Sequence, residues 1–306
     1  MKHVLKDKIR IGVSACNFGA KVRYNRKGWD RIADLDREKS AFVWTPVCPE
    51  VMSGLGVPRE AMKLVDGNGD DFWEGRARMK NKKGENVTKQ LKEGLLSALD
   101  NIKRAGVEAF VFMEGSPSCG VYRTTLKNQR LGKPPGVFGS LLLREQLFLI
   151  PADDLESPVK WWDWRRRLHA FVWIKRKEFK TKKDIIEIWH DFKFLSQEVS
   201  RVRSDELGRK IASMPKKITA KYVSEVKNEI LSILRLPSNI NRIKSSAEKQ
   251  MSHFCKHYNL CETEKLPSTE TAKRKFFDRL IELEKKSISD NINYGFVPVV
   301  YRNNSR

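Results

Sequence analysis

Three of the five cysteines in this 306-residue chain have similar surroundings, which suggests metal chemistry. Cys16, Cys48 and Cys119 each follow an apolar run typical of a β-strand, and Gly, Pro and Ser residues flank all three. Small neighbours allow the backbone to approach a thiolate or a sulfide closely. The structural alternative is that these are buried, unreactive cysteines, because free cysteine is among the most buried residue types.

The number of thiols indicates which metal chemistry to expect. Four thiolates saturate the irons of a cubane cluster, as in electron carriers, whereas three leave one iron open to act as a Lewis acid. A structural zinc would need a fourth protein ligand, and none is apparent near these loops. The odd cysteine count argues against a disulfide framework. Spacing alone leaves both the metal site and the inert cysteines open.

An α/β domain with a mostly parallel sheet and flanking helices should position these thiols. Helical periodicity covers residues 85–104 and ends at Gly106. A Gly/Pro-rich stretch leads into a second helix that ends near residue 147. Strands are predicted at residues 10–14, 41–46, 107–113 and 148–151. Ligand sites form outside the carboxyl ends of parallel strands, so the three thiols should converge on one edge of the sheet.

The second half of the chain has a different pattern and predicts an all-α domain. The acidic, proline-containing stretch Pro151–Pro158 is the best candidate for the boundary. Helices are predicted at about 160–179, 183–200, 219–235, 239–259 and 268–288. We therefore expect a sheet domain over residues 1–152, a helical domain over 160–290 and an extended tail over 291–306.

Several short motifs of the first half resemble, in order, the signature of the TudS-like thiouracil desulfidase family. They are Val13-Ser14-Ala15-Cys16, Val22-Arg23-Tyr24, Pro46-Val47-Cys48-Pro49-Glu50, Gly56-Val57-Pro58-Arg59 and Ser116-Pro117-Ser118-Cys119-Gly120. The resemblance covers about residues 8–150. It implies a 4Fe–4S cluster held by Cys16, Cys48 and Cys119, and an enzyme that removes sulfur from a thiolated uracil without a redox step.

The second half resembles a YbgA-like helical domain more faintly. The motifs are Trp189-His190-Asp191-Phe192-Lys193-Phe194-Leu195, Glu206-Leu207-Gly208-Arg209 and Leu234-Arg235-Leu236-Pro237. This fusion is similar to the tRNA 4-thiouridine desulfidases, which implies thiolated tRNA as substrate and partner. Three other functions stay open: a desulfidase of free thiouracil bases, a non-enzymatic iron–sulfur protein that binds RNA or acts as a sensor, and a sulfur-inserting enzyme.

Glu50 is the predicted general acid–base residue, because it follows a proposed ligand by two positions through the rigid Pro49. A loop cap or a partner for Arg59 is the alternative role. Ser116 is the second predicted catalytic residue, although a turn-stabilising role fits it equally well. The predicted substrate-binding residues are Ser14, Arg23 and Ser118.

The composition favours a polyanionic partner. Lys and Arg number 60 against 38 Asp and Glu, a formal charge of +22, and both halves of the chain are basic. Nucleic acid is the usual polyanion, although a solubility surface is the alternative. Basic runs beside tryptophans favour RNA contact in the helical half, although most of these tryptophans are expected in the core. The predicted RNA-binding residues are Arg165, Arg166, Arg167, Lys175, Arg176 and Lys177.

The sequence also predicts a cytoplasmic protein. No apolar run approaches the roughly 20 residues needed to cross a bilayer, which predicts no membrane association. No apolar segment follows the charged N-terminus, so a secretory signal is not expected. The oligomeric state is not predicted.

Overall fold

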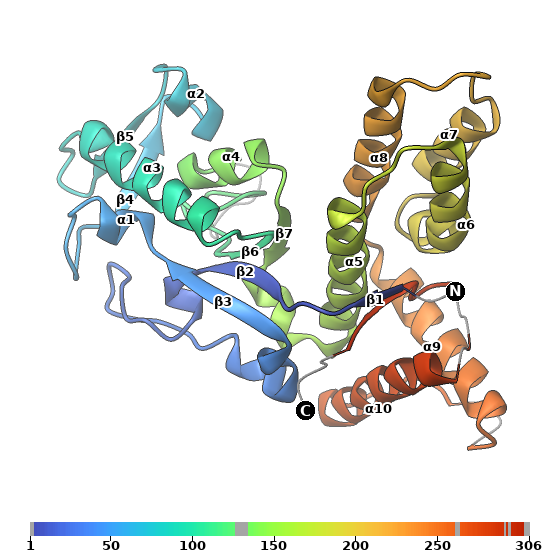
Figure 1. The fold of residues 1–306 in the computed structure, drawn as a ribbon. Coiled ribbons are helices and arrows are strands. Elements are labelled where there is room, and N and C mark those ends of the chain that lie inside the picture. Colours follow the sequence, from blue (N-terminus) through green and yellow to red (C-terminus); the bar gives the residue numbers. More distant parts are fainter. Residues whose placement is uncertain (1–2, 126–133, 261–263, 291, 293–294, 303–306) are drawn as a thin grey trace. The chain divides into compact units, whose positions relative to one another are not determined.

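The computed structural model describes residues 3–125, 134–260, 264–290, 292 and 295–302. They form two compact units (Figure 1). The sheet unit comprises Ile9–Glu156, and the helical unit comprises Met1–Lys8 together with Ser157–Arg306. The start of the chain thus clusters with the helical unit, whereas the sequence grouped it with the sheet domain.

A four-stranded parallel sheet forms the centre of the sheet unit, in the order β3-β2-β6-β7. Its strands are β2 (Ile9–Ser14), β3 (Phe42–Val47), β6 (Ala109–Phe112) and β7 (Phe148–Pro151). Strand β6 is buried along its whole length, as expected for a parallel strand covered on both faces. Strand β3 lies at an edge, where Pro46 is tolerated. The predicted α/β fold with a parallel sheet is confirmed.

The register of the sheet sets two of the cysteines at the same level. Ser14, the last residue of β2, pairs with Val47, the last residue of β3. Cys16, two residues after Ser14, and Cys48, directly after Val47, therefore lie at the same carboxyl edge of the sheet.

Helices and a hairpin complete the sheet unit (Figure 1). The helices are α1 (Pro49–Met52), α2 (Gly69–Trp73), α3 (Thr88–Arg104), α4 (Val137–Arg144) and the 3-10 segments η1 (Ala15–Asn17), η2 (Ala33–Ala41) and η3 (Ala152–Glu156). The hairpin pairs β4 (Met62–Val65) with β5 (Arg78–Asn81). The predicted helix over 85–104 corresponds to α3.

Close packing of α1 on α3 fixes the segment that follows Cys48. A Cβ atom at Gly94 of α3 would collide with the backbone nitrogen and the hydroxyl of Ser53 at the end of α1. The Ser53 hydroxyl also donates to the carbonyl of Pro49 at 2.7 Å. Any larger residue at position 94 would push α1 away from its place at the sheet edge.

The helical unit contains six helices among its described residues. They are α5 (Pro158–Arg176), α6 (Lys182–Val199), α7 (Arg201–Ala212), α8 (Ala220–Leu234), α9 (Ile240–His257) and α10 (Glu270–Ser289). Helix α7 was not predicted. The segment predicted as an extended tail contains β8 (Val299–Tyr301), which pairs in parallel with β1 (His3–Leu5). Cys255 in α9 is disulfide-bonded, which the odd cysteine count did not predict.

Helix α5 is buried on nearly all sides, so the prediction that Arg165, Arg166 and Arg167 bind RNA is wrong for this structure. All three guanidinium groups lie in the protein interior, at most 2% exposed. Arg165 pairs with Glu284 at 3.3 Å, and Arg166 pairs with both Asp163 and Glu198. Buried charges need such partners because desolvation is costly. These residues hold the helical unit together and are unavailable to a polymer at its surface.

Asp163 is the centre of this buried network. Its carboxylate accepts hydrogen bonds from Arg166 at 2.7 Å and from Arg167 at 2.6 Å. Burial alone would raise the pKa of Asp163, but the Arg167 and Arg166 guanidinium groups outweigh burial and hold the pKa below its ordinary value. This stabilisation is therefore present at neutral pH and is lost as the pH falls through the folded pKa.

No helix among the described residues is long and apolar enough to span a membrane.

Replacing Asp163 by Asn should destabilise the helical unit strongly. The substitution keeps the shape of the side chain but removes the charge that Arg166 and Arg167 share. We expect the free energy of unfolding to fall by about 3–5 kcal/mol, because a buried cation is left uncompensated. Denaturant unfolding measures the change. Asp205→Asn breaks an exposed pair with Arg201 and should cost less than about 1 kcal/mol. Equal losses in the two variants would contradict the importance of the buried network.

Candidate active site

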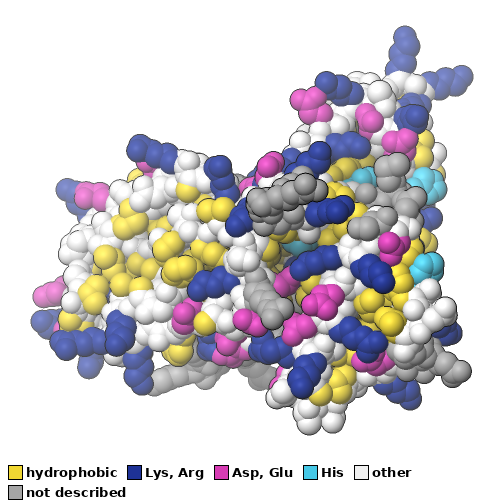
Figure 2. Space-filling view, turned by 60° about the horizontal axis from the view of Figure 1, so that its bottom comes forward, with side chains coloured by type: hydrophobic (Ala, Val, Ile, Leu, Met, Phe, Trp, Pro, Cys, Tyr) yellow, Lys and Arg dark blue, Asp and Glu magenta, His cyan; other side chains and the backbone are white. Residues whose placement is uncertain are grey.

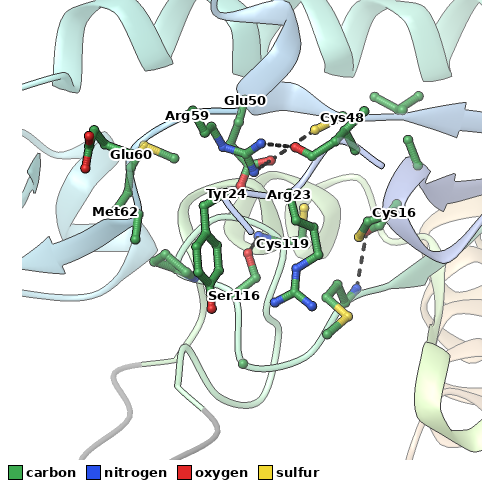
Figure 3. Close-up of a pocket in the computed structure, with 18 residues that line it drawn as sticks. Cys16, Arg23, Tyr24, Cys48, Glu50, Arg59, Glu60, Met62, Ser116 and Cys119 are labelled. Carbon is green, nitrogen blue, oxygen red and sulfur yellow. Dashed lines mark hydrogen bonds and ion pairs between the residues drawn. The ribbon is translucent and has the colours of Figure 1, made fainter. Parts of the chain in front are cut away.

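A pocket opens at the carboxyl edge of the sheet and brings Cys16, Cys48 and Cys119 together (Figure 3). Its wall comes from the ends of β2, β3 and β6 and from the segment that leads into β4. About 650 Å³ inside it is not filled by atoms, including space open to solvent. The predicted convergence of the three thiols is thus present in the structure, and all three thiols are free.

Local backbone structure explains the place of each cysteine. Cys16 lies in η1, directly after β2, and Cys48 stands between β3 and α1 with Pro49 at the first helical position. Cys119 lies in a loop after β6 that folds tightly on itself. A Cβ atom at Gly120 would collide with the carbonyls of Arg123 and Ser116, so only glycine fits there.

The three thiols influence one another electrostatically. Burial, with a contribution from the Glu50 carboxylate, raises the pKa of Cys16 to about 11 and that of Cys48 to about 12. Burial also raises the pKa of Cys119 well above its ordinary value, and Glu50, Cys48 and Cys16 add to this effect. The thiols are therefore protonated at neutral pH, and a metal that binds them as thiolates must displace their protons.

The pocket offers three free thiols as possible metal ligands. Within the described part of the chain, no group of three or more His, Cys, Asp or Glu side chains is arranged to hold one metal ion. In an iron–sulfur cluster the cysteine thiolates bind different irons, and an all-sulfur donor set is the one that such clusters use. The residues present therefore fit this group.

Glu50 is buried beside the thiols and has two partners. Its side-chain carboxylate accepts a hydrogen bond from the Cys48 thiol at 3.3 Å and pairs with the Arg59 guanidinium at 3.3 Å (Figure 3). The Arg59 guanidinium also donates to the carbonyl of Val22. Arg59 thus joins the segment after Cys48 to the segment after Cys16, and it compensates the charge of a carboxylate that is only 6% exposed.

Ser14 and Arg23 line the pocket, as the substrate-binding prediction requires. The Ser14 hydroxyl accepts a hydrogen bond from the backbone of Met113 at 3.3 Å, and it also hydrogen-bonds Cys119. The Arg23 guanidinium lies 4.3 Å from the centre of the Trp29 ring. Ser14 therefore supports the cysteine, whereas Arg23 contributes a stacked cation to the pocket wall.

The two serines of the Cys119 loop have different surroundings. Ser116 lines the pocket, and its hydroxyl accepts hydrogen bonds from the backbone nitrogens of Ser118 at 3.2 Å and Cys119 at 3.0 Å. These two hydrogen bonds correspond to the turn-stabilising role that the sequence left open for Ser116. Ser118 is fully buried and does not line the pocket, and its hydroxyl has no hydrogen-bond partner among the described residues. The structure does not bring Ser118 to the place where a substrate would enter.

Sequence reasoning gave no role to Tyr24, Glu60 or Met62, yet all three line the pocket. The signal for Tyr24 was its place in the motif Val22-Arg23-Tyr24. Glu60 and Met62 belong to the segment that enters β4, a strand that no sequence pattern indicated.

The other predicted RNA-binding residues lie at the end of α5. They belong to the helical unit, whereas the pocket belongs to the sheet unit. Lys175 and Arg176 are exposed, and Lys177 is half-buried with its ammonium 5.0 Å from the centre of the Trp173 ring. Their predicted contact with RNA stays a prediction.

Comparisons with known proteins agree on the sheet unit. The family model for 2-thiouracil desulfurase matches residues 11–154. The uncharacterized protein YbbK of Bacillus subtilis (strain 168) is 32% identical over 152 residues, which cover 48% of this chain and 98% of that protein. A solved structure of a [4Fe-4S]-dependent thiouracil desulfidase, TudS, is 28% identical and matches 48% of this chain and 93% of its own, with a TM-score of 0.38.

The residues that the family model matches lie within the sheet unit, so this similarity describes the part of the chain that contains the pocket. That part carries the three free thiols and the buried Glu50–Arg59 pair, and the similarity to YbbK extends over nearly the whole length of that protein. Through its sheet unit, the chain belongs to the 2-thiouracil desulfurase family.

Proposed function

We propose that the sheet unit is a desulfidase that replaces the thiocarbonyl sulfur of a uracil-type ring by oxygen, with an iron–sulfur cluster held by Cys16, Cys48 and Cys119. The observation that carries the proposal is that three free, buried thiols share one pocket with an ion-paired carboxylate. Membership of the 2-thiouracil desulfurase family supports the reaction type. Water enters and hydrogen sulfide leaves, so the overall reaction needs no oxidant or reductant.

The cofactor and the protein would have separate tasks. A 4Fe–4S cluster on three thiolates would keep one iron free of protein ligands, and that iron supplies Lewis acidity toward a soft thiocarbonyl sulfur. The protein's own residues handle protons and position. Glu50 can take a proton from the attacking water, since its carboxylate lies at the pocket wall within 3.3 Å of Cys48. Arg59 pairs with that carboxylate and orients it.

The substrate we propose is 4-thiouridine within tRNA. The net charge of +22 and the basic character of both halves support a polymeric, anionic substrate. Dark blue Lys and Arg side chains are spread over the face drawn in Figure 2, among fewer magenta carboxylates. A desulfidase of free thiouracil is the second candidate, and a non-enzymatic iron–sulfur protein that binds RNA or acts as a sensor is the third.

Loss of any one of the three pocket cysteines should abolish the cofactor. Anaerobically purified and reconstituted protein should be brown and contain about four irons per chain. Cys16→Ala, Cys48→Ala and Cys119→Ala should each lose this colour and iron. Cys255→Ala changes a cysteine of the helical unit outside the pocket and should keep both. Iron and acid-labile sulfide analysis measures the result. A colourless wild-type protein with stoichiometric zinc would end the cluster proposal.

Substrate assays distinguish the remaining functions. The reconstituted protein is mixed separately with thiolated tRNA and with free 4-thiouracil, and the thiocarbonyl absorbance is followed. Turnover of tRNA with little turnover of the free base supports the tRNA proposal. The reverse favours the free-base enzyme. A loaded protein that consumes neither substrate contradicts both desulfidase proposals and favours the non-enzymatic role.

Replacement of Glu50 by Gln separates proton transfer from loop support. Gln keeps the size of the side chain and its capacity to accept a hydrogen bond from Cys48, but it cannot titrate. We expect turnover per assembled cluster to fall by about 10²–10⁴, the usual range for a general acid–base residue. Iron content should stay near normal, and tRNA should still bind.

The rate must be divided by cluster content, because a loop role would lower the yield of loaded protein instead. If the loaded fraction of the Glu50→Gln variant works at the wild-type rate, Glu50 is a structural partner of Arg59. Ser116 would then be the next candidate.

A further inference from the structure

The loop directly after Cys16 forms one wall of the pocket and carries a dense group of cations. Lys21, Arg23, Arg26 and Lys27 fall within seven consecutive residues that contain no acidic residue. Three of them, Lys21, Arg26 and Lys27, are exposed, and no ion pair joins them to a carboxylate in the described part of the chain. These charges are therefore available to a partner, in contrast to the buried arginines of α5.

Backbone contacts hold this loop beside Cys16. The backbone nitrogen of Trp29 donates to the carbonyl of Cys16 at 2.6 Å, and that of Gly19 donates to the carbonyl of Trp29 at 2.9 Å. The two ends of the loop also touch, because a Cβ atom at Gly28 would collide with the carbonyl of Ala20. A loop whose backbone is closed in this way has less backbone freedom to lose on binding.

Tyr24 stands in the middle of the loop and faces the pocket. Half of its surface is exposed, although large aromatic side chains are usually covered. In Figure 3 the Tyr24 ring and the Arg23 side chain border the same cavity as Ser116 and Cys119. The Arg23 guanidinium lies 5.6 Å from the centre of the Tyr24 ring and 4.3 Å from that of Trp29. One face of the pocket mouth is thus built from an exposed ring with a cation beside it.

Aromatic rings with cations around them are the usual means of binding unpaired nucleic acid. Bases stack on the rings, and Lys and Arg neutralise the phosphates on either side. An unpaired segment is required, because a base inside a duplex cannot reach a pocket of this kind. A free base would use the ring but would have no phosphates for the outer lysines.

We propose that residues 21–27 form a capture loop for an unpaired RNA segment, in which Tyr24 stacks on the thiolated base and Lys21, Arg26 and Lys27 bind the flanking phosphates. This inference rests on the proposed desulfidase function, and it assigns polymer recognition to the same unit that carries the thiols.

The test compares two charge-reversal variants of the full-length, reconstituted protein. Lys21→Glu/Lys27→Glu changes the capture loop. Lys103→Glu/Arg104→Glu makes the same change in net charge at the end of α3, where the chain returns to the amino end of β6. The probe is a short single-stranded RNA with one 4-thiouridine. Its dissociation constant is measured by fluorescence anisotropy at several salt concentrations, independently of turnover.

Loss of two phosphate contacts should lower the slope of log K against log salt by about 1.4, since each contact on a single strand contributes about 0.7. Affinity at low salt should fall by at least tenfold for Lys21→Glu/Lys27→Glu and stay near the wild-type value for the control. The ratio of kcat/KM for the RNA to that for free 4-thiouracil should fall in parallel. Equal weakening in both variants, or none in the loop variant, would overturn the capture loop.

Substitutions of Tyr24 provide a second test of the proposal. Tyr24→Phe keeps an aromatic ring and should bind the RNA like the wild type. Tyr24→Leu should weaken binding by about 10- to 100-fold, the size of one base–aromatic stack. Wild-type affinity in the Leu variant would remove stacking from the proposal.

Failure of this inference is distinguishable from failure of the proposed function. If free 4-thiouracil is consumed and the loop variants bind RNA like the wild type, the desulfidase proposal is supported and the capture-loop proposal is wrong. If the loop variants weaken RNA binding but neither substrate loses sulfur, the capture-loop proposal is supported and the desulfidase proposal is wrong.

Discussion

The burial of a carboxylate among three thiols is the constraint on which this site depends. Burial raises the pKa of each neighbouring thiol and Glu50 adds to this effect, while the charge of Glu50 itself would be costly in the interior without a partner. Arg59 provides that partner and reaches across to the carbonyl of Val22. The same contact therefore stabilises the charge and ties the segments after two cysteines to each other. A cationic centre held by the three cysteines would favour their thiolate forms, because thiolate charge and metal charge compensate each other.

The topology of the sheet unit supplies the scaffold around this constraint. Parallel strands end at one edge, and the pairing of Ser14 with Val47 brings the first two cysteines out at the same level. The third arrives on a longer loop, which needs its own supports: the Ser116 hydroxyl accepts from the Cys119 backbone, and Gly120 permits a close backbone approach. Such support limits the reorganisation that loading of the site would require. It also explains why Ser116 lies at the pocket wall while its hydroxyl is already engaged by the backbone.

Sequence patterns predicted the parts of the fold that depend on local periodicity or on runs of apolar residues. The four sheet strands and helix α3 belong to this group, and the convergence of the thiols followed from the parallel topology. Contacts between distant segments escaped prediction. Strand β8 (Val299–Tyr301) exists because it pairs with a three-residue strand at the other end of the chain, and neither strand is long enough to show a pattern. Helix α7 (Arg201–Ala212) is short, strongly charged and interrupted by Gly208, so its apolar periodicity is weak. Ser118 looked like a pocket residue because it adjoins Cys119, but adjacent residues of a tight loop point in different directions.

The distribution of positive charge shows why net charge alone is a poor guide to a binding surface. In α5, Asp163 precedes Arg166 and Arg167 by three and four residues, the spacing at which helical side chains meet. Tryptophans stand near the basic run in the sequence. The helix therefore combines large apolar side chains with ion-paired arginines, and both are buried. The loop over residues 21–27 has neither feature: no carboxylate interrupts it, and its single aromatic ring, Tyr24, is half exposed. An acid at helical spacing from an arginine, together with neighbouring tryptophans, thus accompanies a buried pair in α5, whereas cations in a closed loop without acids are left for solvent or for a polyanion. By that criterion, the surface that we propose for an RNA chain lies beside the thiols and not on the arginine run of the helical unit.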